Sequence, residues 1–209
     1  MTIDNPVQLH ACRGATSTCP NALVGTGELL AGIDTVLAAF DARSADTPAA
    51  PAGHAHLRFT IGIAACPNAC SRPQIMDVGF IRAEYPAFEA ERCTGCGACV
   101  RACREGCLSI EGKRLSFSPA SCVGCGDCRR ACPVNAITRA RTGFRVLVGG
   151  RLGRHPRLAT ELPGICTTEL ACDHLSACLN AVHTAARPGV RLATLLEAGN
   201  PALRRRLGL

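Results

Sequence analysis

The sequence is poor in aromatic side chains and in lysine. Aromatic residues make up 3% of its 209 residues, tryptophan is absent, and Lys113 is the only lysine among 23 basic residues. Proteins that hold single-stranded nucleic acid stack bases on aromatic rings, and few rings are present here. We therefore expect no nucleic-acid partner despite a formal net charge of +7. Arginine instead suits carboxylates and oxyanions through its planar fork.

Long apolar runs are also lacking. The most apolar window, residues 23–40, contains Glu28 and Asp34 and so does not predict a membrane span. The N-terminus has no basic stretch followed by an apolar run, which is the pattern of a secretory signal. We therefore expect a cytoplasmic protein, in which thiols serve as metal ligands rather than as disulfides.

Cysteine is abundant, with 16 residues. Eight of them fall into two frames of the same spacing, C-x2-C-x2-C-x3-C, which are Cys93, Cys96, Cys99, Cys103 and Cys122, Cys125, Cys128, Cys132. The doubled frame is typical of ferredoxins with two [4Fe–4S] clusters. A zinc site or a disulfide framework is the alternative, and two full quartets in this register disfavour it.

In such frames the fourth cysteine of one repeat belongs to the cluster of the other. The expected ligand sets are Cys93, Cys96 and Cys99 with Cys132, and Cys122, Cys125 and Cys128 with Cys103. Four glycines lie inside the loops, where the backbone must turn tightly and direct N–H groups at sulfur: Gly95, Gly97, Gly124 and Gly126. The chain is predicted to transfer electrons.

Two further cysteine pairs lie outside the frames, Cys12 with Cys19 and Cys66 with Cys70. The tetrapeptide Cys-Pro-Asn-Ala begins at Cys19 and again at Cys66, and its proline fits the first position of a helix. A helix N-terminus favours a thiolate through its unpaired N–H groups and dipole. The two pairs are candidates for a third cluster, with small buried thiols as the alternative.

Apolar periodicity predicts regular elements around these motifs. Helices are expected at 20–40, 167–186 and 192–196, and strands at 57–63 and 75–81. The stretch 41–56 is rich in Ala and Pro and predicts a surface connection.

The segment Cys-Pro-Asn-Ala-Cys-Ser-Arg-Pro at 66–73 resembles the C-x3-C signature of the siroheme-dependent nitrite and sulfite reductases. Cys12 and Cys19 resemble the cysteine pair that precedes this signature in the family. A ferredoxin module inserted directly after it is similar to the dissimilatory and anaerobic sulfite reductases. Residues 143–158 resemble the strand and glycine turn with which the family's fold resumes.

This resemblance implies an α+β fold. A reductase-like [4Fe–4S]/siroheme half-domain would occupy 1–91 and 138–209, with a two-cluster ferredoxin domain inserted at 92–137 and helices at the C-terminus. A third [4Fe–4S] cluster would be held by Cys12, Cys19, Cys66 and Cys70, with the Cys70 thiolate bridging to the siroheme iron. An electron-donor protein or reductase subunit would supply electrons for reduction of sulfite or nitrite, a small oxyanion.

The sequence departs from the family in three respects. Cys12 and Cys19 enclose six residues where the family has five, and Arg104 follows Cys103 where the second frame has Pro133. In the family, a half-domain also precedes the first cysteine pair, so three alternatives are open: a partner chain supplies that half, the chain is a fragment, or the family's chemistry has been lost. A second function stays open, that of a haem-free, polyferredoxin-like electron-transfer subunit of a larger reductase complex.

Side chains near the reductase-like motifs are candidates for contact with siroheme or substrate. The candidate catalytic residues are Arg72, Arg154 and His155, and the candidate siroheme contacts are Cys70, Arg72, Arg151, Arg154, Gly149 and Gly150. Solvated surface arginines, a structural histidine and a tight glycine turn are the alternatives.

Four cysteines remain, namely Cys107, Cys166, Cys172 and Cys178. The last three recur every six residues, which places them on different faces of a helix. With Cys107 they are candidates for a fourth metal site, and ordinary buried cysteines are the alternative.

Overall fold

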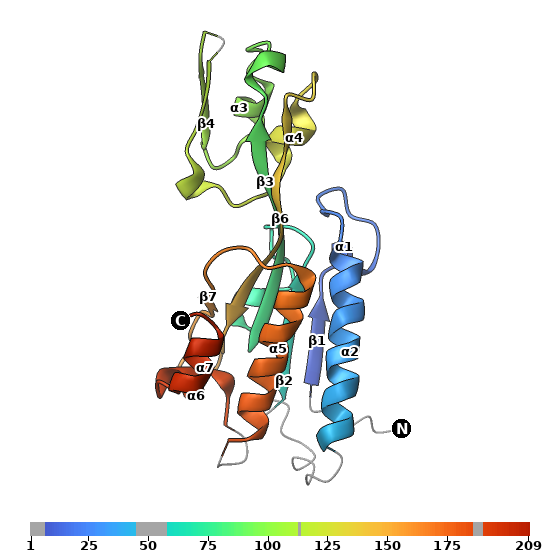
Figure 1. Cartoon of the computed structure of the whole chain (residues 1–209), viewed down its shortest axis with the longest axis vertical. Helices are drawn as coiled ribbons and strands as arrows, with labels where there is room; N and C mark the ends of the chain where they lie inside the picture. The colour runs from blue at the N-terminus through green and yellow to red at the C-terminus, as the bar shows by residue number, and fades with distance from the viewer. Residues whose placement is uncertain (1–6, 45–57, 113, 186–189) are drawn as a thin grey trace.

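The computed structural model describes residues 7–44, 58–112, 114–185 and 190–209. The molecule is elongated, with a lower lobe built on a sheet and an upper lobe that carries the doubled cysteine frames (Figure 1). Two long strands, β3 (Val78–Phe88) and β6 (Ile137–Val148), pair antiparallel and run through both lobes.

The main sheet has five strands in the order β1-β2-β3-β6-β7. β1 (Val7–Ala11), β2 (Phe59–Ala64) and β3 are parallel neighbours, and β7 (Thr160–Glu161) pairs antiparallel with β6. The strand predicted at 57–63 is observed as β2, although residue 57 lies outside the described residues. The strand predicted at 75–81 starts later and is longer, because β6 pairs with it along its length.

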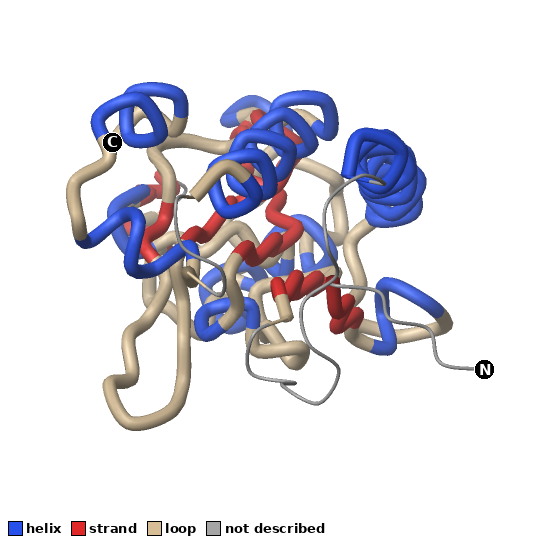
Figure 2. The backbone as a smooth tube through the Cα atoms, turned by 90° about the horizontal axis from the view of Figure 1, so that it is seen from below, coloured by secondary structure: helices blue, strands red, loops and turns tan. Residues whose placement is uncertain are grey.

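Helices cover one face of this sheet. α2 (Thr26–Ser44) and α5 (Thr168–His183) pack against each other on it, and α6 (Leu192–Glu197) and α7 (Pro201–Arg206) pack against α5 (Figure 2). The core between helices and sheet includes Ile61, Phe80 and Val146. The predicted C-terminal helices are therefore confirmed, with Thr167 accepting a hydrogen bond from the Leu170 N–H at 3.3 Å as the N-cap of α5.

The opposite face of β2 and β3 is covered by residues 65–77, which lead from the end of β2 back to the start of β3. A 3-10 turn, η2 (Pro73–Ile75), lies directly on Gly62 and Gly79, where a Cβ would collide with Pro73. Small residues on this face thus let the backbone that carries Cys66 and Cys70 lie close against the sheet.

The helix predicted from Pro20 was wrong in its start. α1 (Arg13–Thr16) is a single turn, and α2 begins only at Thr26. Between them the Leu23 N–H donates to Ala65 O at 2.9 Å, and Gly25 has a φ of +97°, which no helix contains. Neither Cys-Pro-Asn-Ala tetrapeptide opens a helix, because both lie in turns.

The upper lobe lies between β3 and β6. Its elements are η3 (Ala90–Arg92), α3 (Ala98–Ala102), β4 (Leu108–Glu111), β5 (Arg114–Phe117), η4 (Pro119–Ser121) and α4 (Asp127–Ala131). β4 and β5 form a hairpin that the sequence pattern did not predict. Among the described residues, no helix is both long and apolar enough to cross a bilayer.

Candidate metal centres

The two cysteine frames fold alike, 29 residues apart. Cys93 follows η3 and Cys122 follows η4, and their N–H groups donate to Ala90 O at 3.2 Å and Pro119 O at 3.1 Å. The last cysteine of each frame, Cys103 or Cys132, ends α3 or α4. The repeat in the sequence is therefore a repeat in the structure.

The four loop glycines behave as the sequence predicts. All have left-handed backbones, with φ of +73° at Gly95, +72° at Gly97, and +71° at Gly124 and Gly126. A side chain at such a φ costs about 1–2 kcal/mol, so glycine is what allows each loop to curl around its cysteines.

Backbone N–H groups are directed at sulfur in both repeats. Cys103 Sγ accepts from the Cys107 N–H at 3.3 Å, and Cys132 Sγ accepts from the Ala136 N–H at 3.2 Å. The Ala98 N–H donates to the Cys96 sulfur and lowers the pKa of that thiol. Hydrogen bonds to the charged form favour a thiolate, and at Cys96 the Thr94 side chain and the charge of Arg101 add to the effect.

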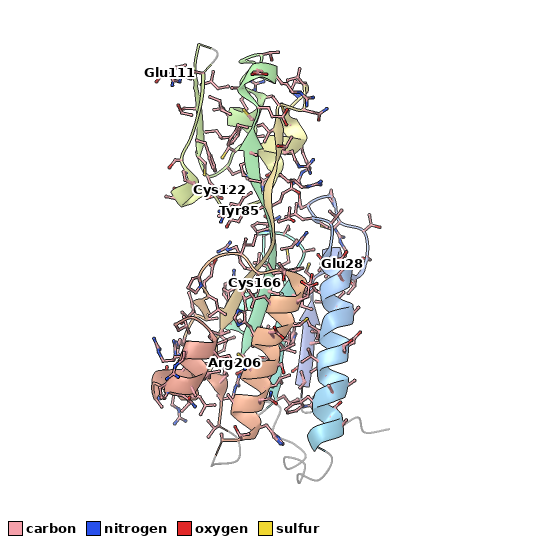
Figure 3. All side chains as sticks on the ribbon, in the orientation of Figure 1. Glu28, Tyr85, Glu111, Cys122, Cys166 and Arg206 are labelled. Carbon is pink, nitrogen blue, oxygen red and sulfur yellow. The ribbon has the colours of Figure 1, made fainter. Side chains whose placement is uncertain are left out.

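Folding brings the cysteines together across the repeats. One cavity of about 530 Å³ is lined in part by Cys93, Cys96, Cys99 and Cys132, hereafter the first site. A second cavity is lined by Cys122, Cys125, Cys128 and Cys103, hereafter the second site. Cys122 of the second site lies beside Tyr85 of β3, where the two lobes meet (Figure 3).

Burial and crowding make these thiols hard to ionise alone. Burial raises the pKa of Cys128 to about 12, with the neighbouring Cys125 adding to the effect. Burial likewise raises the pKa of Cys99, with Cys132 and Cys93 adding to it. Thiolates crowded in this way need positive charge between them, which metal ions supply.

The predicted donor set of each cavity consists of four cysteines, which suits an iron–sulfur cluster. Among the described residues, no three His, Cys, Asp or Glu side chains converge as ligands of a single metal ion. A cubane is larger than an ion and separates its thiolates further. The donor set, four cysteines per cavity with N–H groups aimed at sulfur, fits a [4Fe–4S] cluster.

The remaining cysteine pairs meet at the upper edge of the main sheet. Cys12 directly follows β1 and Cys66 lies just beyond β2, and parallel strands end at the same edge. The Ala65 N–H donates to Cys12 Sγ at 3.3 Å. The pKa of Cys66 is raised by burial and by the nearby sulfurs of Cys12, Cys19 and Cys70. These four cysteines are hereafter the third site.

The repeated Cys-Pro-Asn-Ala turns still supply N–H groups to sulfur. The Asn21 N–H lowers the pKa of the Cys19 thiol, and the Arg13 side chain adds to the effect. The Asn68 N–H is the counterpart at Cys66, where burial outweighs it. The N–H groups come from turns rather than from helix N-termini, and the predicted stabilisation of thiolate holds at Cys19 but not at Cys66, whose pKa is raised overall.

The candidate arginines lie in two loops, Arg72 before η2 and Arg151 with Arg154 in the turn after β6. Arg72 is exposed, directly before η2, with a left-handed φ of +55°. Arg151 is engaged inside the chain, because its guanidinium binds both Glu197 oxygens at 3.1 Å and its Nε donates to His155 O at 2.9 Å. Arg154 and His155 are exposed in the turn that Arg151 and Arg157 close.

Packing within the chain accounts for the glycine turn. Gly149 has a φ of +76°, and a Cβ there would lie 2.7 Å from Leu196 Cδ1. A Cβ at Gly150 would lie 2.6 Å from Met76 O. Both glycines therefore let the backbone pack closely against η2 and α6, as the tight-turn alternative expects. Their contact with siroheme stays a prediction.

The fourth metal site suggested by the sequence was wrong. Cys107 is in the upper lobe and lines the cavity of the second site, whereas Cys166, Cys172 and Cys178 are buried in the core of the lower lobe. Figure 3 marks Cys166 in that lobe. Cys172 packs against α2 at Gly32, and burial raises the pKa of Cys166 and Cys178. These three are ordinary buried cysteines.

Sequence reasoning missed a buried carboxylate between the lobes. Glu84 of β3 has a side-chain exposure of 5% and pairs with Arg129 of α4 and with Arg139 of β6 at 2.7 Å. Burial alone would raise the pKa of Glu84, but hydrogen bonds from both arginines lower it overall. A lone glutamate between apolar residues carries no spacing signal, so only the fold reveals its partners.

Comparison with known proteins agrees with this geometry. A family model described as the nitrite and sulphite reductase 4Fe-4S domain matches residues 3–202. The sequence is 38% identical over 144 residues, 69% of this chain, to Coenzyme F420-dependent sulfite reductase of Methanocaldococcus jannaschii, and the match covers 21% of that protein. It is 42% identical over 59 residues, 27% of this chain, to one of the subunits of the anaerobic sulfite reductase of Salmonella typhimurium, covering 17% of that protein.

The matched regions thus span about a fifth of the length of these curated relatives. Among solved structures, the fold is similar to that of dissimilatory sulfite reductase I, with a TM-score of 0.60 at 16% identity. That similarity covers 96% of this chain and 51% of the other, which shows a shared fold.

Proposed function

This chain belongs to the nitrite and sulphite reductase 4Fe-4S domain family, and we propose that it is an iron–sulfur subunit of a sulfite-reducing enzyme. Three [4Fe–4S] clusters would occupy the first, second and third sites. One observation carries the proposal: twelve cysteines from distant parts of the sequence gather into three quartets.

When bound, such clusters supply one-electron transfer, and a siroheme supplies the iron at which an oxyanion is reduced. The contribution of this chain is to hold and shield the thiolates. Left-handed glycines shape the loops, and N–H groups of Cys107 and Ala136 donate to the sulfurs of Cys103 and Cys132. Burial of Cys99 and Cys128 keeps water away from two of the ligands.

Exposure supports Cys70 as the residue that bridges to siroheme. Cys66 is buried, Cys12 and Cys19 are half-buried, and Cys70 is exposed. A sulfur that binds a cluster on one side and haem iron on the other needs open space, and in the third site Cys70 has it. Arg72 follows two residues later and is also exposed, so its guanidinium is available for a siroheme carboxylate or a substrate oxygen.

The test is analysis of anaerobically purified protein. Three cubanes require about twelve irons and as many acid-labile sulfides per chain, and siroheme is extractable and identified by its absorption. Cys70→Ala should remove the third cluster together with siroheme, whereas Cys166→Ala, a buried cysteine in the helix-covered core, should leave both in place. Zinc in place of iron and sulfide would refute the proposal.

A second candidate function is that of a haem-free electron-transfer subunit. The internal engagement of Arg151 by Glu197, and the packing of Gly149 and Gly150 within the chain, favour it. It predicts the same cluster irons, without siroheme and the one further iron that siroheme carries. The two functions are distinguished by adding a partner that carries the preceding half-domain and siroheme. If this chain is a sulfite-reducing subunit, the complex must reduce sulfite with electrons that have entered this chain.

A further inference from the structure

The upper lobe meets the third site through a specific set of contacts, and these single out one of the two ferredoxin repeats. We propose that Leu23, Arg82 and Glu84 form a joint that holds the second site against the third site. Of the two ferredoxin-type sites, the second is then nearer to the third site than the first is. The inference rests on the proposed function, since it concerns clusters that the cysteine quartets would hold.

On the upper side, Glu84 of the joint binds the loop of the second site. The Glu84 N–H donates to Gly124 O at 2.7 Å, and Glu84 forms a parallel β-bridge with Cys125. A Cβ at Gly126 would lie 3.0 Å from Glu84 Oε1. The Glu84 carboxylate also binds Arg129, the residue after Cys128, so β3 is fixed to both ends of this cysteine loop.

On the lower side, Arg82 of the same strand, β3, binds the loop that follows Cys19. Arg82 Nε donates to Val24 O at 2.7 Å, and a Cβ at Gly25 would lie 2.9 Å from the Arg82 guanidinium. Arg82 and Glu84 are two residues apart on β3, so their side chains project from the same face. One strand face therefore contacts the loops of both sites.

Leu23 closes the joint between them. Its N–H donates to Ala65 O, next to Cys66, at 2.9 Å. Its Cδ2 lies 3.5 Å from the position of a Cβ at Gly126, and the side chain is 6% exposed. A buried leucine thus fills the space between a loop of the third site and a loop of the second.

The equivalent loop of the first repeat has different surroundings. Its cavity is lined by Phe88, Ile110 and Leu115, from the far end of β3 and from the β4–β5 hairpin. The two repeats are nearly alike in fold, but the joint contacts only one of them. That repeat is the one that contains Cys125.

Electron paramagnetic resonance of the fully reduced protein tests this placement. An iron count of about twelve per chain first establishes that the sites are filled, so failure of the proposed function is recognised before the joint is tested. The signal that disappears in Cys19→Ala identifies the third-site cluster. Its spin relaxation is then compared in Cys125→Ala and Cys96→Ala, which alter equivalent positions of the two repeats.

Cys125→Ala should slow the spin relaxation of the third-site cluster, because its nearer magnetic neighbour is lost, and Cys96→Ala should leave it at the wild-type rate. The reverse pattern, or equal effects, would overturn the assignment. Loss of a ligand can unfold the insert, so a second set of variants keeps all twelve cysteines.

In that set, Arg82→Gln and Leu23→Ala loosen the joint, and Arg92→Gln is the control. Arg92 forms an exposed ion pair with Glu89 at 3.1 Å beside the first site. We expect unchanged iron in all three, weaker coupling between the second and third sites in the first two, and wild-type coupling in the control. Wild-type coupling in an Arg82→Gln, Leu23→Ala double variant would show that these residues do not position the sites.

Discussion

At the scale of single residues, the grouping of the cysteines around two cavities could be predicted from the sequence because cluster ligation depends on fixed spacing. Two C-x2-C-x2-C-x3-C frames allow few arrangements, and the left-handed glycines within them have a direct conformational cause. The donors to sulfur were less predictable. For Cys19 and Cys66 a helix N-terminus was expected, and a turn supplies the N–H group in its place.

Cys107 offers a test of which cysteines in the second site are ligands. It lines that cavity, but burial raises its pKa to about 11, and the other repeat has Ala136 in the equivalent position. We expect Cys107→Ala to retain all iron, because its N–H still donates to Cys103 Sγ. Cys103→Ala should lose about four irons, one cubane. Iron and sulfide analysis of both variants measures this difference. Equal losses of iron in Cys107→Ala and Cys103→Ala would show that Cys107 is a ligand.

Alanine substitutions at Gly124 and Gly106 distinguish the stability cost of backbone strain from that of close packing. Both have positive φ, +71° and +64°, but a Cβ at Gly124 would lie 3.0 Å from Ala83 Cβ, whereas nothing lies within 4 Å at Gly106. Gly106→Ala should cost about 1–2 kcal/mol from the backbone alone. Gly124→Ala should cost more, since the cysteine loop must also move away from β3.

Anaerobic urea titration that follows cluster absorbance measures both variants against the wild-type protein. If Gly106→Ala lowers the midpoint as much as Gly124→Ala does, packing of the loop on β3 contributes nothing to stability.

At the scale of elements, apolar periodicity predicted β2, α5 and α6, all of which bury apolar side chains in the core under the helices. It did not predict β1 or the length of β3 and β6. β3 continues beyond its apolar residues to Phe88 because β6 pairs with it across an insert of about 50 residues, and such long-range pairing leaves no local signal. The start of α2 was misjudged because Leu23 bonds to Ala65, a contact between distant segments.

Packing of α2 against α5 can be tested with two glycines of α2. A Cβ at Gly27 would meet nothing within 4 Å, so Gly27→Ala should stabilise the protein by about 0.5–1 kcal/mol through helix propensity. A Cβ at Gly32 would lie 2.6 Å from Cys172 Sγ, so Gly32→Ala should destabilise it.

Cys172→Ala should rescue Gly32→Ala in a double-mutant cycle, because the removed sulfur makes room for the added methyl group. Thermal unfolding temperatures measure all four proteins. Additive effects of the two substitutions would mean that the helices do not meet at this point.

At the scale of the whole molecule, one antiparallel ribbon joins a reductase-like sheet to a lobe that carries two cysteine quartets (Figure 1). The parallel strands β1 and β2 place the third site at the sheet edge that faces this lobe. The sequence predicted the contents of both parts, but the joint at Glu84 depends on how they are placed, which spacing alone does not encode. Cytoplasmic location and an electron-donor protein or reductase subunit as partner stay predictions.

The central claim is that this chain holds three cubanes, one in each quartet. Native mass spectrometry of the anaerobically purified protein tests it most directly, because it weighs the intact chain with its bound groups. We expect a mass excess over the 21.8 kDa polypeptide equal to three [4Fe–4S] cores plus one siroheme, falling to two cores alone in Cys66→Ala. An excess of only two cores in the wild-type protein, unchanged by Cys66→Ala, would contradict the account.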